Sequence, residues 1–144
     1  MKKNLPVNNQ IDREQWSESS KRSYVYHYQR QHYEDIPYVC RRCRKACVFT
    51  GADQKIAFEI KKQYISQRRT LCGDCHAAFV ALRDLHRAME LKWAAQKVAL
   101  SRDLAFMEAW RNVLVLFPEF GSRIGGNMTK RLAVLIGEVT ASTP

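Results

Sequence analysis

The sequence of 144 residues predicts an α+β protein, in which a small module organised by cysteines precedes a mainly helical C-terminal part of about three helices. Four cysteines form the pairs Cys40/Cys43 and Cys72/Cys75, separated by the 28 residues 44–71. Beyond residue 76, apolar residues recur at helical spacing. We therefore expect a polar, partly flexible N-terminal segment at 1–22, the module at 23–76, and a helical region at 77–144 that packs on the module.

The spacing of the four paired cysteines predicts a metal site. Two residues between thiols let both sulfurs reach one ion from a single tight turn, and two such turns complete a tetrahedral shell. We predict that Cys40, Cys43, Cys72 and Cys75 bind one structural Zn²⁺ in a module of zinc-ribbon or treble-clef-like fold. Mononuclear iron and four buried thiols without metal are the weaker alternatives. Four sulfurs leave no open position, so a structural role is expected.

Three further residues could take part in chemistry at or near this site. Cys47 could replace a ligand or react as a free thiol, but we expect a small buried apolar residue. His76 directly follows Cys75, and we expect it on the first turn of a helix, with a hydrogen bond near the site. His86 is a lone helical histidine, for which packing is the simpler interpretation.

A tyrosine-rich segment precedes the first cysteine pair. Tyr24, Tyr26 and Tyr28 alternate with Val25 and His27, and this period of two predicts a strand. One face of that strand would be a stripe of tyrosines. Such a stripe either covers a small core or stacks on nucleobases, and the core is the expected role.

Helix signals follow the first cysteine pair. Thr50 to Asp53 resembles a capping box and predicts a short helix at 54–62. Ile56 and Ile60 are expected to face inward, with Phe58 as a further candidate. A long helix is expected from Cys75 to about Leu100.

Two more helices are expected after residue 100. Ser101 is the expected cap of the first, in which Trp110 belongs to an apolar face and which Pro118 ends. Asn127 is the expected cap of the second.

Positive charge is concentrated around the cysteines. The formal net charge of the chain is +10, and residues 40–75 alone contain nine Lys/Arg and three Asp/Glu. Such a surface favours phosphate-bearing or acidic partners, although solubility alone is an equally simple explanation. The candidate nucleic-acid contacts are Arg41, Arg42, Arg44, Lys45, Lys61, Lys62, Arg68 and Arg69.

The sequence gives little sign of a membrane or export signal. Its apolar runs are far shorter than the ~20 residues needed to span a bilayer. Met1 to Pro6 is not followed by the apolar core of a signal peptide. We therefore expect a cytoplasmic protein without a membrane partner, in a reducing compartment where paired cysteines bind metals more often than they form disulfides.

One segment raises the question of catalysis. The string from Leu71 to His76 resembles the second half of HNH nucleases, where such a turn opens a helix. Those nucleases need histidines between the two cysteine pairs to hold a catalytic cation and activate water. Residues 44–71 contain no histidine. The chain is therefore expected not to be an enzyme.

A longer string carries a family resemblance over about residues 33–76. It runs Tyr33-x-Asp35-x-Pro37-Tyr38-x-Cys40-x-x-Cys43 and continues through Val48-Phe49-Thr50, Gln54-Lys55 and Glu59 to Leu71-Cys72-x-x-Cys75. This string resembles an uncharacterised bacterial family of probable zinc-ribbon domains. The resemblance implies the same four cysteine ligands and no particular activity. Arg44 departs from the glycine often found after the second cysteine of such a turn.

Two functions follow as hypotheses. The first is a zinc-binding, basic and non-catalytic protein that binds nucleic acid with little sequence preference. The alternative is a protein–protein adaptor or a small subunit of a larger assembly. In that case the helices beyond residue 76 would bind a protein partner or a second copy of the chain.

Overall fold

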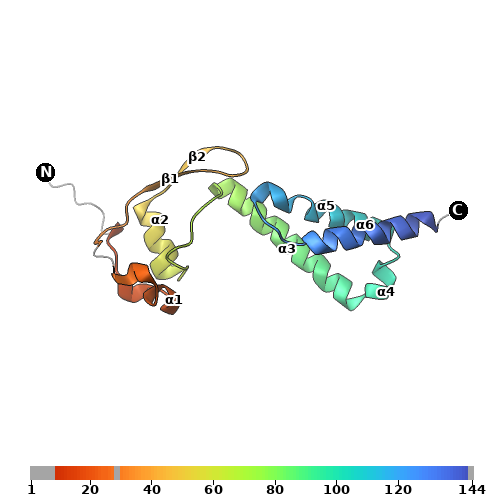
Figure 1. Cartoon of the computed structure of the whole chain (residues 1–144), viewed down its shortest axis with the longest axis horizontal. Helices are drawn as coiled ribbons and strands as arrows, with labels where there is room; N and C mark the ends of the chain where they lie inside the picture. The colour runs from red at the N-terminus through yellow and green to blue at the C-terminus, as the bar shows by residue number, and fades with distance from the viewer. Residues whose placement is uncertain (1–8, 28–29, 143–144) are drawn as a thin grey trace. The chain divides into compact units, whose positions relative to one another are not determined.

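The computed structural model describes residues 9–27 and 30–142, which form parts of two compact units (Figure 1). The first unit comprises Met1–Cys40 and Arg44–Thr70, and the second comprises Arg41–Cys43 and Leu71–Pro144. The expected flexible N-terminus falls partly on residues 1–8, outside the described residues. The expected domain limits and the packing of the helices on the module stay predictions.

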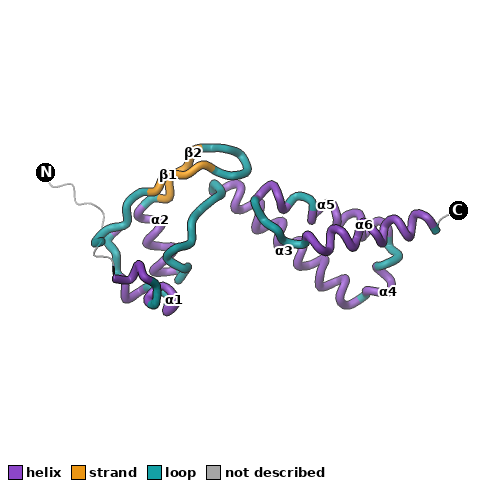
Figure 2. Tube along the Cα trace, in the orientation of Figure 1, coloured by secondary structure: helices purple, strands orange, loops and turns teal. Residues whose placement is uncertain are grey.

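The first unit is built on a β-hairpin. Strands β1 (Ile36–Val39) and β2 (Ala46–Phe49) pair antiparallel, with Ile36 opposite Phe49 and Val39 opposite Ala46. Figure 2 shows both strands in orange. The remaining elements of this unit are short: η2 (Arg13–Gln15), α1 (Glu18–Lys21), η3 (Tyr24–His27), α2 (Gly51–Lys55) and the π-helical η4 (Ile56–Ile60).

Aromatic rings fill the core of the first unit. Phe58 lies with its ring centroid 5.9 Å from those of both Tyr33 and Phe49. Trp16 is buried beside them, and its Nε1 donates a hydrogen bond of 2.8 Å to the Tyr33 hydroxyl. Burial raises the pKa of Tyr33 far above its usual range, so the phenol stays neutral.

The predicted tyrosine strand is wrong. Tyr24–His27 form the 3-10 helix η3, and Tyr28 lies outside the described residues. The Tyr26 hydroxyl donates to Glu14 Oε1 at 2.7 Å, an interaction that raises the pKa of Tyr26. Alternation over so few residues is a weak signal, because a strand also needs a neighbour to satisfy its backbone hydrogen bonds.

The helix after Thr50 begins at Gly51 rather than at residue 54, and of the three residues predicted to face inward only Phe58 is buried. Thr50 Oγ1 accepts a hydrogen bond of 3.1 Å from Asp53 N, which confirms the cap. Ile56 and Ile60 are 44% and 70% exposed, so their predicted inward orientation is wrong. The buried face instead begins at the polar Gln54, whose amide donates to Glu34 O and Phe49 O at 2.6 and 3.0 Å. Because the buried face includes this polar residue, the spacing of the apolar residues did not indicate it. The two hydrogen bonds make the burial of the amide tolerable.

The second unit is mainly helical, as expected. Its elements are α3 (Gly73–Ala95), α4 (Lys97–Leu100), α5 (Leu104–Leu114), η5 (Phe117–Phe120) and α6 (Gly126–Ala141). Figure 2 shows helix through most of this unit. Helix α5 packs against α6 and α3. The buried core residues are Trp93, Leu100, Met107, Trp110, Val113, Leu114, Phe117 and Leu132.

Two predicted helix starts are displaced. Asp103, and not Ser101, caps α5, because its Oδ1 accepts from Phe106 N at 3.1 Å. The short helix α4 ends at Leu100, and the cap of α5 follows two residues later than the predicted cap at Ser101. The cap of helix α6 is Gly125, which adopts a left-handed backbone conformation, and not Asn127 as predicted. Pro118 lies inside η5, after α5 has already ended.

His86 has the packing role expected of it. It is 9% exposed, and Trp110 Nε1 donates to its Nδ1 at 3.0 Å. Its ring also lies edge-on to Phe117, at 5.7 Å between centroids. The hydrogen bond satisfies both buried polar atoms within an apolar core. None of the helices in the described ranges is long and apolar enough to cross a bilayer.

Trp110→Ala should lower the free energy of unfolding by ~3–5 kcal/mol, because it empties a large buried volume and leaves His86 Nδ1 without its donor. Urea titration followed by circular dichroism measures the loss. Lys97→Ala is the control, since Lys97 is exposed and should change stability little. Equal stability of the two variants would contradict the placement of this core.

Gly51→Ala should destabilise the first unit by ~1–3 kcal/mol. A Cβ at Gly51 would lie 2.5 Å from Tyr33 O and 2.8 Å from Asn9 Cβ. Gly73→Ala is the matched control, because a Cβ there meets nothing within 4 Å. Thermal unfolding should give a lower Tm for Gly51→Ala and an unchanged or slightly higher Tm for Gly73→Ala; the opposite order would refute the close approach.

Candidate metal centre

The first cysteine pair lies in the turn between β1 and β2. Cys40 N donates to Lys45 O at 2.8 Å, and Arg44 N donates to Cys40 O at 2.9 Å. Arg44 adopts a φ of 64°, the left-handed conformation that glycine adopts most readily. The turn is therefore closed although Arg44 replaces the glycine common at this position.

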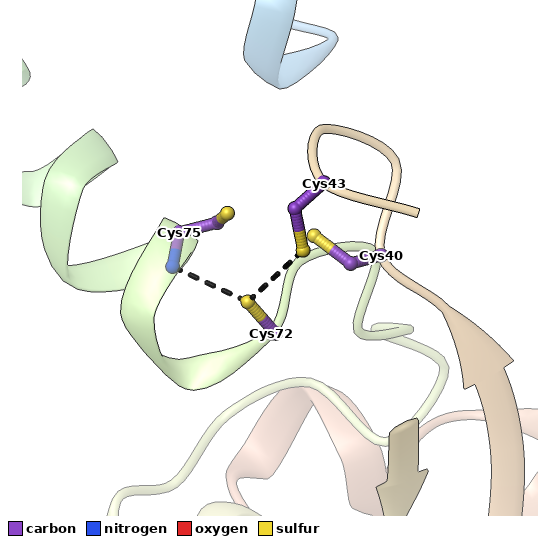
Figure 3. Close-up of side chains that lie close together, drawn as sticks. All are labelled: Cys40, Cys43, Cys72 and Cys75. Atoms are coloured by element: carbon purple, nitrogen blue, oxygen red, sulfur yellow. Dashed lines mark hydrogen bonds between the residues drawn. The ribbon is translucent and has the colours of Figure 1, made fainter. Parts of the chain in front are cut away.

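The second pair opens helix α3. Cys72 is its N-cap, and its Sγ accepts a hydrogen bond of 3.4 Å from Cys75 N. His76 N donates to Cys72 O at 2.8 Å and completes the first turn. This turn brings the sulfurs of Cys72 and Cys75 to the same side, where Figure 3 shows Cys40 and Cys43 directed toward them.

The geometry of the four sulfurs fits one tetrahedral ion. All four Sγ atoms lie within 4.8 Å of one another, and Cys43 Sγ is 3.7 Å from Cys72 Sγ. A Zn–S distance of ~2.3 Å places tetrahedral ligands ~3.8 Å apart. A disulfide would need an S–S distance of ~2.05 Å, far shorter than the separation of the Cys43 and Cys72 sulfurs. The predicted ligand set is thus positioned to bind one metal ion, and four soft sulfur donors suit zinc.

Positive groups adjoin the sulfurs. Arg42 Nη1 donates to Cys75 Sγ at 3.8 Å, and this hydrogen bond raises the pKa of Arg42 above its usual value. The positive end of the α3 dipole lies at Cys72 and Cys75. Both would partly offset the negative charge of four thiolates around one ion.

Cys47 and His76 are not part of the cluster of four sulfurs. Cys47 is half-buried in β2 rather than fully buried as expected, and its thiol donates to Lys45 O at 3.4 Å. His76 is exposed on the first turn of α3, as expected. The hydrogen bond near the site that we expected for His76 is made instead by Arg42.

The eight basic candidates differ in what they contact. Arg42 also pairs with Glu119 at 3.7 Å and lies 4.6 Å over the Phe120 ring. Arg69 pairs with Asp53 at 3.9 Å and lies 4.2 Å over Phe49. These two arginines therefore have structural contacts that the sequence did not indicate.

The other candidates are more open to solvent. Lys62 Nζ donates to Gln15 O, and Arg41 lies beside Gly121. Arg44, Lys45, Lys61 and Arg68 are exposed, with no ion-pair partner within the part of the chain that the structure describes. The role of all eight in binding stays a prediction.

Sequence reasoning missed a pocket in the first unit. Its volume is about 470 Å³. Aromatic residues and arginines from separate segments share its lining: Trp16, Tyr33, Tyr38, Phe49, Phe58, Arg13, Arg30, Arg68 and Arg69. No local motif could reveal this site, because its residues come together only in the fold.

Comparison with known families agrees with this geometry. Residues 34–81, a third of the chain, match the model of a family described as "Probable treble clef domain". The cysteine cluster and this match show a treble clef domain with a two-stranded sheet, followed by a mainly helical C-terminal part. The expected fold class and the zinc-binding module are confirmed. Among curated proteins no match is found. No solved structure matches the chain either.

Purified protein should contain about one zinc per chain, and Cys72→Ser should lose it. Structural zinc contributes ~10–16 kcal/mol of apparent binding free energy in small peptides at neutral pH. Atomic emission spectrometry measures the metal, and circular dichroism with a strong chelator measures its effect on folding. Cys47→Ser is the matched control and should keep both zinc and fold. Zinc loss in Cys47→Ser with retention in Cys72→Ser would refute the ligand assignment.

Proposed function

We propose that this chain is a non-catalytic, zinc-organised protein that binds nucleic acid with little sequence preference. The observation that carries the proposal is the set of exposed cations in the treble clef domain. Arg44, Lys45, Lys61 and Arg68 have no ion-pair partner among the described residues, so they are available to phosphates. Phosphate contacts supply affinity without reading the base sequence.

The metal has a structural role in this proposal. Four sulfurs fill a tetrahedral shell and leave no position for a substrate or an activated water. The zinc would therefore stabilise the turn that carries Arg44 and Lys45 rather than perform chemistry. The proposal places the chain in the reducing cytoplasm, where thiols remain available to metals.

An adaptor role is the second candidate, supported by the second unit. Several large apolar side chains there are exposed: Leu85, Leu91, Val98, Val115, Leu116 and Val134. Exposed apolar side chains can belong to a protein interface, although singly scattered ones are common on soluble proteins. Association through them would be insensitive to salt, whereas nucleic-acid binding would not. Light scattering at low and high salt separates the two.

Affinity for a generic duplex should fall steeply with salt, because each neutralised phosphate releases bound counterions. Log affinity against log salt should slope by about −0.9 per contact on duplex DNA and about −0.7 on single strands. The triple variant Lys45→Glu, Lys61→Glu, Arg68→Glu should abolish binding and keep zinc content and helicity. Fluorescence anisotropy of labelled oligonucleotides measures both effects.

A charge-matched triple variant is the control for this experiment. Arg87→Glu, Lys97→Glu and Arg111→Glu change the net charge equally but lie on exposed positions of the helical unit. This variant should bind nearly as well as the parent. Equal losses in both triple variants would show that only net charge matters. No binding of the parent to DNA or RNA at low salt would refute the proposal.

A further inference from the structure

The pocket of the first unit has a lining that is both aromatic and cationic. Trp16, Tyr33, Phe49 and Phe58 are nearly fully buried and give it an apolar interior. Tyr38, on β1, is only half-buried and also lines the pocket. A pocket of about 470 Å³ falls within the range of ~300–1,000 Å³ that is typical of small-molecule sites. Its size is therefore compatible with one nucleotide.

The charged side chains that line the pocket indicate which class of ligand it suits. The lining contains the four arginines Arg13, Arg30, Arg68 and Arg69, against only two carboxylates. One carboxylate, that of Asp35, already accepts a hydrogen bond of 2.7 Å from Gly51 N. A site with excess positive charge beside an accessible aromatic ring suits a ligand that is anionic and flat.

Two of these arginines, Arg30 and Arg68, are available to a phosphate. Arg30 and Arg68 are exposed, and neither has an ion-pair partner among the described residues. Arg69 is less available, because it lies over Phe49 and pairs with Asp53. Arginine binds phosphate oxygens with two parallel donors, which a lysine cannot do.

We propose that this pocket binds one unpaired nucleotide of a nucleic-acid strand, with the base against Tyr38 and the phosphate at Arg30 and Arg68. The inference rests on the proposed nucleic-acid function and deepens it. Ser66 and Gln67 also line the pocket and offer adaptable polar groups to the edge of the base. Stacking accepts every base, since each has a π face, and so the site agrees with weak sequence preference.

The test compares two duplexes that differ by one base. Each contains a single bulged position, which is adenosine in one and an abasic residue in the other, and both are made as DNA and as RNA. Anisotropy at constant salt should give about tenfold tighter binding of the adenosine bulge, equivalent to about 1.4 kcal/mol. A ratio near one for both nucleic acids overturns the pocket proposal. No binding even to a fully paired duplex overturns the proposed function itself.

Variants of Tyr38 locate the effect. Tyr38→Ala should bring the ratio close to one and leave affinity for a fully paired duplex unchanged, whereas Tyr38→Phe should keep the ratio. Tyr64→Ala is the matched control, because Tyr64 is exposed in the same unit and does not line the pocket. Retention of the ratio in Tyr38→Ala overturns the assignment.

A spectroscopic measurement on the parent protein does not depend on any variant folding. 2-Aminopurine at the bulged position should lose fluorescence on binding, because the base stacks on an aromatic ring. Unchanged fluorescence overturns the proposal. Adenosine monophosphate should compete only weakly. Tight binding of this free nucleotide without preference for the bulged strand overturns the proposal in favour of a site for free nucleotides.

Discussion

Sulfur–metal coordination is the constraint on which the treble clef domain depends. The hairpin has only four residues in each strand, so its backbone pairing alone holds it weakly. A pair of such short strands is marginal in water by itself. Four sulfurs within 4.8 Å of one another supply the missing restraint, because each Cys-x-x-Cys turn must keep its shape to satisfy a tetrahedral ion. The helix dipole of α3 and the guanidinium of Arg42 then lower the cost of gathering thiolates.

The sequence sufficed to predict those features that depend on local chemistry. Two thiols separated by two residues have few other uses, so the ligands were predictable without any knowledge of the fold. Thr50 was predictable for a similar reason, because a cap is decided within one turn of helix. Trp110 followed from a long, regular apolar spacing, in which a chance match is less common.

Features that depend on tertiary contacts were mispredicted or missed. Alternation at Tyr24–His27 indicated a strand, but no partner strand is available to it among the described residues. The burial of Gln54 was missed, because the acceptors of its amide, Glu34 O and Phe49 O, come within reach of it only in the folded chain. The contacts of Arg42 with Phe120 and Glu119 join residues far apart in sequence, so composition alone overstated the number of free cations.

The left-handed backbone at Arg44, directly after the second cysteine of the metal-binding turn, is a conformation that favours glycine. A residue with a Cβ pays roughly 1–2 kcal/mol in this conformation. Structural zinc contributes ~10–16 kcal/mol in comparable peptides, so the turn tolerates that strain easily. The metal-bound turn therefore does not require glycine at residue 44, and the side chain there can suit solvent or a ligand. In this chain a long cationic side chain occupies it, exposed to solvent between the ligand Cys43 and the start of β2.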